Sequence, residues 1–140
     1  MSDCIFCAIL AGEAEASVVA ETERALAFLD IEPITPGHTV LVPRTHAARL
    51  ADLHVDDGAE LFRLAQRTAA ALYASGLRAE GVNLFLADGE AAGQDVFHAH
   101  LHVLPRFGGD GFGLRFPPDH RVRERAELDD VAEKLREAWM

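Results

Sequence analysis

Three of the seven histidines in this chain, His98, His100 and His102, alternate with apolar residues. Alternate side chains of an extended strand point to the same face, so this spacing predicts a row of imidazoles about 6.6 Å apart on one face. Near neutral pH an imidazole can act as a nucleophile, an acid, a base, a hydrogen-bond donor or a metal ligand. The row therefore predicts a reactive or ligand-binding site. Its plainer alternatives are a solvated strand face and an incidental metal-binding tract.

Cys4 and Cys7 are the only cysteines of the chain. A structural disulfide does not fit an intracellular protein, and a redox motif of this spacing normally follows a strand in a βαβ unit. Two thiolates could instead supply half of a tetrahedral zinc site, with histidines as the other ligands. A pair of ordinary buried thiols is the alternative.

The elements that would position these residues are short strands around one long helix. Apolar residues at three- and four-residue spacing predict a helix within 52–75, with acidic residues at its start and Gly76 as its C-terminal cap. Shorter helices are predicted at 4–10 and, with an amphipathic pattern, at 128–139. Strands are predicted at 17–21, 25–29, 39–43, 82–86 and 97–104. This order predicts an α+β fold with a mainly antiparallel sheet, one long helix and a C-terminal helix.

Length and composition predict a single domain over residues 1–140. The chain is 49% hydrophobic and 26% charged, as soluble globular proteins are. No apolar stretch approaches the roughly 20 residues that cross a bilayer, and residues 1–7 lack the features of a secretory signal. We therefore expect a cytoplasmic protein with no membrane partner.

The net charge of −10 argues against broad nucleic-acid binding, which needs a basic surface. We therefore expect no nucleic-acid partner. A small phosphorylated ligand, held locally by imidazoles and backbone amides, remains compatible with an acidic chain.

The histidine row resembles the signature of the histidine triad (HIT) superfamily, His-φ-His-φ-His-φ-φ with φ apolar, which residues 98–104 match. Residues 28–30 and 36–46 resemble the second conserved block of that superfamily, and residues 89–94 resemble the loop before the triad. The chain is most similar to the small bacterial, Hint-like branch that carries an N-terminal Cys-x-x-Cys.

The resemblance implies a homodimer that binds a purine nucleotide or nucleotide conjugate and hydrolyses or transfers it at the α-phosphate. His100 would attack phosphorus and form a nucleotidyl-histidine intermediate, which water then releases. His102 would hydrogen-bond the phosphate oxygens, and Gln94 would lie near the phosphate or leaving group as a third catalytic residue. The expected substrate-binding residues are Phe6, Asp30, Ile31, Asn83, Gln94, Asp95 and His102.

In the cysteine-bearing branch, the resemblance also implies a zinc ion held by Cys4, Cys7, His46 and His98. Such a set is complete without water, so the zinc would be structural rather than catalytic. If this ion binds, His98 is fixed and His100 gains a rigid neighbour.

Two positions depart from the pattern of the superfamily. Asp95 stands where many relatives have Ser or Thr, and Ala87 stands where relatives often have Asn. Both put the leaving-group preference and the turnover in question, so a nucleotide-binding or scaffold protein with little turnover is the second hypothesis. A zinc-dependent regulator without a nucleotide role is a third and weaker one.

For several further residues, the sequence allows both a functional and a structural interpretation. Phe6, Ile31 and Leu41 could form walls of a purine pocket or belong to the ordinary core. His38 could lie near the site or simply close a loop with a hydrogen bond. Nucleoside phosphoramidates and dinucleoside polyphosphates are both compatible as substrates.

Overall fold

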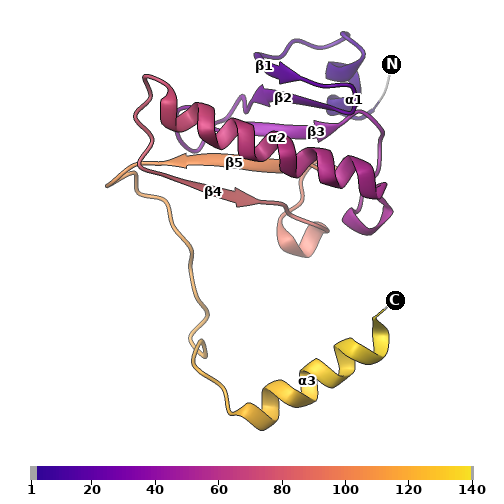
Figure 1. Ribbon diagram of the computed structural model, residues 1–140, viewed down its shortest axis with the longest axis vertical. Helices are drawn as coiled ribbons and strands as arrows, with labels where there is room; N and C mark the ends of the chain where they lie inside the picture. The colour runs from indigo at the N-terminus through magenta and orange to yellow at the C-terminus, as the bar shows by residue number, and fades with distance from the viewer. Residues whose placement is uncertain (1–2, 140) are drawn as a thin grey trace.

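An antiparallel sheet with strand order β1-β2-β3-β5-β4 forms the centre of the molecule (Figure 1). The computed structural model describes residues 3–139, and within them the sheet has five strands. The strands are β1 (Val18–Glu21), β2 (Ala25–Leu29), β3 (Thr39–Pro43), β4 (Gly81–Phe85) and β5 (Leu101–Arg106). The helices are α1 (Ile5–Leu10), α2 (Val55–Ala74) and α3 (Arg125–Ala138), with short 3-10 turns at Leu50–Asp52 and Glu90–Ala92. The predicted α+β class is confirmed.

The long helix α2 covers one face of the sheet (Figure 1). Its buried side chains recur at three- and four-residue spacing, as the sequence pattern predicts, and pack with Leu41 and Val103 of the sheet. Leu41 is completely buried in this cluster, so it belongs to the core and not to a pocket wall. The prediction of a cap at Gly76 is wrong, because α2 ends at Ala74 and Ser75 occupies the cap position.

The opposite face of the sheet carries α1 and a second, smaller core. Phe6 of α1 packs there with alternate residues of β2 and β3, among them Phe28, Val40 and Val42. Alternation along β3 thus sends Leu41 to one layer and its two neighbours to the other. The functional side chains described below lie on the α1 side of the sheet.

The predicted histidine strand at 97–104 begins later than expected, at Leu101. His98 and His100 therefore precede β5, in backbone that belongs to no strand. Only His102 lies within the sheet, paired with Val40 of β3 and Phe85 of β4. The three histidines are not a regular row: the ring centroids of His100 and His102 are 4.9 Å apart, closer than the spacing along an ideal strand.

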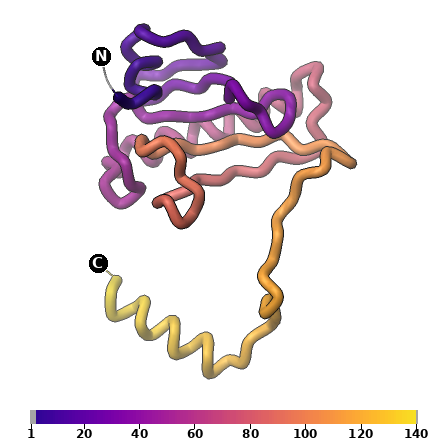
Figure 2. The backbone as a smooth tube through the Cα atoms, turned by 180° about the vertical axis from the view of Figure 1, so that it is seen from behind, coloured from indigo at the N-terminus to yellow at the C-terminus, as the bar shows by residue number. Residues whose placement is uncertain are grey.

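After β5 the chain leaves the sheet and runs to α3, which lies apart from the other elements (Figures 1 and 2). No residue of α3 is buried. The amphipathic stripe is present, but Leu128, Val131 and Leu135 are 42%, 55% and 62% exposed. Among the described residues, no helix is both long enough and apolar enough to span a bilayer.

Candidate functional site

His98 is the completely buried centre of the site. Its Nε2 lies 2.8 Å from the carbonyl oxygen of Pro43 and donates a hydrogen bond to it, because a carbonyl can only accept. This bond places the ring proton on Nε2 and leaves a lone pair on Nδ1. Burial lowers the pKa of His98 below its ordinary value, so the ring is neutral at pH 7.

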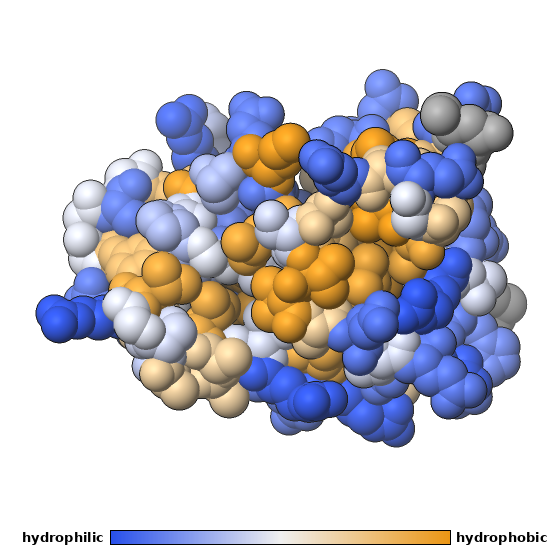
Figure 3. All heavy atoms as spheres, turned by 90° about the horizontal axis from the view of Figure 1, so that it is seen from above, coloured by the Kyte–Doolittle hydropathy of each residue, from blue (hydrophilic) through white to orange (hydrophobic). Residues whose placement is uncertain are grey.

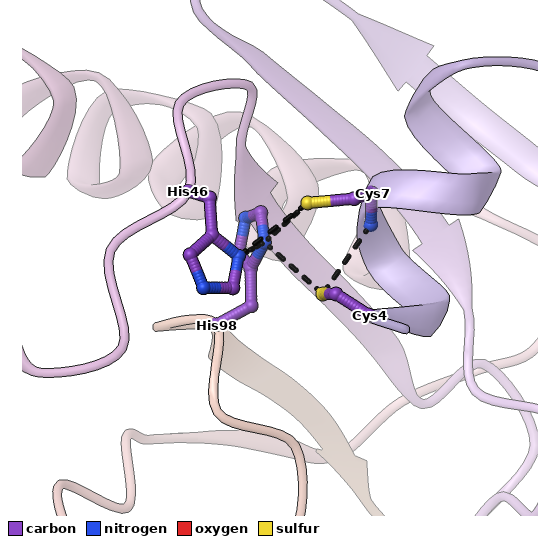
Figure 4. A group of neighbouring side chains, drawn as sticks. All are labelled: Cys4, Cys7, His46 and His98. Carbon is purple, nitrogen blue, oxygen red and sulfur yellow. Dashed lines mark hydrogen bonds between the residues drawn. The ribbon is translucent and has the colours of Figure 1, made fainter. Parts of the chain in front are cut away.

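The lone pair on Nδ1 of His98 faces two cysteine sulfurs and a second histidine (Figure 4). Nδ1 lies 3.5 Å from Cys4 Sγ, 3.6 Å from Cys7 Sγ and 3.2 Å from His46 Nδ1. Cys7 Sγ lies 3.4 Å from His46 Nδ1. Ligands of one tetrahedral zinc ion lie about 3.3 Å apart for two nitrogens and about 3.6 Å for nitrogen and sulfur, given ordinary bond lengths. The four side chains therefore fit a single tetrahedral metal ion.

Three separate segments bring these four ligands together. Cys4 caps the N-terminus of α1, and Cys7 lies in the first turn, where its N–H donates to Cys4 Sγ. His46 follows β3, and His98 precedes β5. The Pro43 carbonyl that orients His98 is the kind of outer partner that metal-bound histidines usually have. The donor set predicted from the sequence is thus assembled by the fold.

His100 presents an unprotonated nitrogen to a pocket. Its Nδ1 lies 2.8 Å from the carbonyl oxygen of His98 and donates to it, so Nε2 holds the lone pair. The ring lines the pocket while being only 3% exposed, and the edge of Phe6 packs against it. An imidazole nitrogen held in this way is oriented as a nucleophile.

A further histidine, His38, determines which nitrogen of His102 carries its proton. His38 Nδ1 accepts a hydrogen bond from the Ile34 N–H, so its proton lies on Nε2. That Nε2 lies 2.9 Å from His102 Nδ1 and donates to it. His102 therefore carries its own proton on Nε2. Burial lowers the pKa of His102 to about 4, with His100 and His38 adding to the effect, so the ring is a neutral donor at pH 7.

Asp30, His38 and His102 also lie close enough to resemble a metal site. His38 excludes this use, because its Nδ1 already accepts from Ile34 and its Nε2 must keep the proton. A protonated nitrogen has no lone pair for a metal ion. Asp30 Oδ2 lies 3.6 Å from that same Nε2, so the carboxylate supports the protonated form. The cluster is a hydrogen-bond relay, and His38 does more than close its loop.

The pocket beside His100 and His102 has a volume of about 940 Å³. Phe6 and Ile31 line it, together with residues that the sequence did not indicate: Ile9, Glu15, Ser17, Phe28 and Val40. Ser17 directly precedes β1, so the pocket opens beside the β1 edge of the sheet. Seen over that edge, apolar side chains gather in the middle of the surface with hydrophilic ones around them (Figure 3). A flat apolar group such as a nucleobase fits these surroundings.

Two carboxylates also line the pocket. Asp30 Oδ1 accepts a hydrogen bond from the Glu32 N–H at 2.8 Å, which fixes the side chain at the pocket wall. Asp95 is 85% exposed, and its Oδ1 lies 3.9 Å from His100 Nε2. The position that departs from the superfamily pattern thus holds a carboxylate next to the candidate nucleophile.

Gln94 is buried, and its amide is engaged within the protein. Its Nε2 donates to the carbonyl oxygens of Ala48 and Val96, and its Oε1 accepts from the Gly89 N–H at 2.7 Å. Gly89 has φ +96°, a conformation that favours glycine. In this structure Gln94 joins the loop after β3 to the loop before His98, and it does not line the pocket.

Asn83 lies on β4 and does not line the pocket either. Its Oδ1 accepts a hydrogen bond from Arg106 at 2.8 Å. Another residue of β4, Phe85, was not indicated by the sequence, yet its ring stacks on His102 with centroids 4.3 Å apart. Phe85 reaches His102 through their antiparallel pairing, which the structure shows and the local sequence does not indicate.

Solved structures from bacteria and a yeast resemble this chain. HIT family proteins of Bacillus anthracis and Bacillus subtilis are 35% and 33% identical, each with a TM-score of 0.90 over 99% of both chains. A Zn-bound histidine triad family protein of Mycobacterium smegmatis is 42% identical over 97% of both chains, with a TM-score of 0.77. A histidine triad nucleotide-binding protein of Candida albicans is 29% identical, with a TM-score of 0.86 over 97% of this chain and 96% of that one.

Sequence comparison leads to the same group. A HIT-like protein of Methanocaldococcus jannaschii is 38% identical over 95% of this chain and 98% of its own length. The family model of the HIT domain matches residues 11–109, which include the pocket histidines and the carboxylates of Asp30 and Asp95. This chain is a member of the HIT family, which supports a nucleotide hydrolase or transferase kind of function.

Proposed function

We propose that this chain hydrolyses purine nucleotide conjugates, or transfers their nucleotidyl group, through a covalent intermediate on His100. The observation that carries the proposal is the bond from His100 Nδ1 to the His98 carbonyl, which leaves Nε2 unprotonated beside the pocket. Membership of the HIT family and the nucleotide-binding relative from Candida albicans support the substrate class.

In the proposed reaction, His100 Nε2 attacks the α-phosphorus, and the bond from phosphorus to the leaving nitrogen or oxygen breaks with its electron pair going to the leaving atom. A leaving amine takes up a proton from solvent, whereas a leaving phosphate departs as an anion. His102 Nε2–H donates to a phosphate oxygen, where negative charge increases as the bond to His100 forms. A water molecule then attacks the phosphorus of the nucleotidyl-histidine and gives up a proton to solvent. The bond from phosphorus to His100 Nε2 breaks, its electron pair returns to that nitrogen, and a nucleoside monophosphate is released. His38 keeps His102 in the donor form throughout.

The lining of the pocket supports positions for the rest of the nucleotide. We infer that Phe6 and Ile31 contact the base and that Asp30 accepts hydrogen bonds from the ribose hydroxyls, because all three line the pocket. Gln94 acts by holding the Gly89 loop beside the site. Nucleoside phosphoramidates and dinucleoside polyphosphates both fit this arrangement.

We also propose that the Cys4, Cys7, His46 and His98 cluster holds zinc. The fit of the donor atoms to a tetrahedron and the Zn-bound relative from Mycobacterium smegmatis support this. The ion would be structural and would hold His98, whose carbonyl in turn orients His100.

A second copy of the chain is the further partner that we propose. β4 is an edge strand with half-exposed Leu84 and Phe85, and the neighbouring helix α2 exposes Phe62 and Tyr73. An unpaired strand edge beside large apolar side chains is suited to a self-complementary interface.

The proposal is tested by single turnover of an adenosine phosphoramidate. His100→Ala should lower AMP release by about 10³-fold or more, because no other group replaces the nucleophile. The same variant should still bind AMP. In the wild type, a nucleotidyl adduct should be found on the peptide that contains His100.

His120→Ala is the matched control, because His120 is an exposed histidine outside the pocket. It should turn over like the wild type. Undiminished turnover in His100→Ala would exclude the covalent mechanism. AMP binding without turnover in the wild type would instead favour the nucleotide-binding or scaffold hypothesis, for which Asp95 beside His100 provides a reason: its charge repels an anionic substrate.

A further inference from the structure

A clamp of charged and aromatic groups fixes the direction in which the chain leaves β5. The Arg106 guanidinium donates two hydrogen bonds of 2.8 Å to the Asp110 carboxylate, and it lies 5.2 Å from the centre of the Phe112 ring. The backbone N–H groups of Phe107 and Phe112 also donate to Asp110. Arg106 and these amides hold the pKa of Asp110 well below its ordinary value. The turn is thus stabilised by a charge-assisted network, and it points the following residues away from the sheet.

The residues beyond this clamp, 113–139, form what we call the C-terminal arm. The arm passes the β4 edge, and α3 lies beyond that edge (Figures 1 and 2). Its large apolar side chains are exposed: Leu114 is 84% and Val122 97% exposed, and no residue of α3 is buried. A helix of 14 residues is marginal on its own in water, and most helices gain their stability by packing an apolar face. The stripe on α3 therefore requires a surface that its own sheet does not provide.

The same arm position recurs in crystals of relatives. The arm makes up about a fifth of the chain, so a TM-score of 0.90 over 99% of both chains requires that the arm superposes together with the sheet. The two Bacillus proteins share only 35% and 33% identity with this chain. An arm that its own sheet does not touch needs a neighbouring molecule to hold it in one position, and another copy of the same chain is a neighbour that a crystal always contains. A chance lattice contact would not reproduce the position in different proteins.

We propose that the C-terminal arm crosses to a second copy of this chain and that α3 docks on that copy through Leu128, Val131 and Leu135. In a dimer with twofold symmetry each copy then receives the arm of the other. This inference rests on the proposed dimer and adds to it the segment that links the two copies. It does not depend on the reaction at His100.

Sedimentation velocity over a dilution series tests the exchange. The variant Leu128→Ala/Val131→Ala/Leu135→Ala removes the apolar stripe while keeping residues that favour helix. The matched control Glu133→Ala/Glu137→Ala changes the opposite side of α3. We expect a wild-type dimer, a dissociation constant raised about 10-fold or more by the stripe variant, and no such change in the control.

Trypsin digestion of the same samples reports on the arm itself, which contains Arg115, Arg121 and Arg123 between the clamp and α3. In the wild type, cleavage there should be slow for the dimer and fast after dilution to monomer. The stripe variant should be cleaved quickly at every concentration. Zinc content and AMP release, measured in parallel, show that the sheet and the pocket remain folded in all three proteins.

Two results would overturn the inference, and they can be told apart. A wild type that is monomeric at every concentration would remove both the proposed dimer and the exchange, and it would leave the arm to a partner other than this chain. A stripe variant that dimerises and resists trypsin like the control would remove only the exchange. Neither result bears on the covalent mechanism.

Discussion

At the scale of single residues, the site is built by hydrogen bonds that assign one proton to each imidazole. A backbone carbonyl accepts from His98 Nε2, which leaves Nδ1 for a metal ion. Another carbonyl accepts from His100 Nδ1, which leaves Nε2 for phosphorus. A backbone N–H donates to His38 Nδ1, so His38 carries its proton on Nε2 and donates it to His102 Nδ1. His102 therefore carries its own proton on Nε2 and can act as a donor. The sequence spacing predicted that these residues act together. It could not assign their protons, because each depends on a backbone group outside the motif.

His38 gives the residue-scale prediction. His38→Leu removes the donor to His102 Nδ1, so the proton of His102 is no longer held on Nε2 and turnover should fall about 10- to 100-fold. His38→Gln supplies an amide N–H and should recover most of the loss. AMP release measures turnover, and the nitrogen chemical shifts of His102 report which ring atom carries the proton.

A merely structural role for His38 predicts a different pattern. In that case both variants would lose zinc or unfold at lower denaturant concentration to the same extent, and the His102 shifts would stay those of the wild type. The positioning role is therefore tested by a signal that loss of packing does not produce.

At the scale of elements, the site depends on where each element begins. The sequence placed the five strands within a few residues of their positions, because alternating apolar residues reflect burial on a sheet face. It extended the histidine strand backwards to residue 97, because alternation alone cannot tell a strand from an extended loop. His98 and His100 both precede β5, where His98 lies beside the cysteines at the start of α1 and His100 lines the pocket. The sequence did not indicate Phe85, because a local stretch of sequence does not show which residues pair across two strands.

The zinc cluster gives the element-scale prediction. α1 has only six residues and buries Phe6 and Ala8, so we expect metal bonds to hold it on the sheet. Cys4→Ser should remove zinc and lower the free energy of unfolding by about 2–4 kcal/mol, as expected for an ion that binds only the folded state. Turnover should fall as well, because His98 orients His100.

Chelation provides the control for this prediction. A strong zinc chelator should lower the midpoint of denaturant unfolding of the wild type towards that of Cys4→Ser and should leave the variant unchanged. Metal analysis of the purified wild type should find about one zinc per chain. A wild type without zinc, with the same unfolding midpoint as Cys4→Ser, would contradict a structural ion.

At the scale of the whole molecule, two parts differ in how far the sequence explains them. The layered part, with α2 on one side of the sheet and α1 on the other, follows from apolar patterns that have matching partners within the chain. The apolar stripe at 128–139 predicted a helix, and α3 is observed there. A stripe does not say which surface it meets, so its separation from the sheet could not be foreseen.

Three neutral histidines in the layered part make the stability of the whole molecule depend on pH. Burial lowers the pKa values of His38, His98 and His102, that of His102 to about 4. Above pH 7 both the folded and the unfolded chain keep these rings neutral, so they contribute no pH dependence. As the pH falls from about 6.5 towards about 4, these three histidines bind protons in the unfolded chain but stay neutral in the folded chain. The free energy of unfolding therefore decreases.

The share of His102 can be isolated by comparing denaturant unfolding at pH 7.5 and pH 5.5. A pKa shift of this size is worth about 1.4 kcal/mol over that interval, and partial exposure of the ring reduces it to about 1 kcal/mol. His102→Asn should therefore lose less stability on acidification than the wild type by about that amount. The exposed histidine variant His120→Ala should behave like the wild type. Equal losses in His102→Asn and the wild type would show that the folded protein protonates His102 as readily as the unfolded chain does, and the ring could then not serve as a neutral donor held by His38.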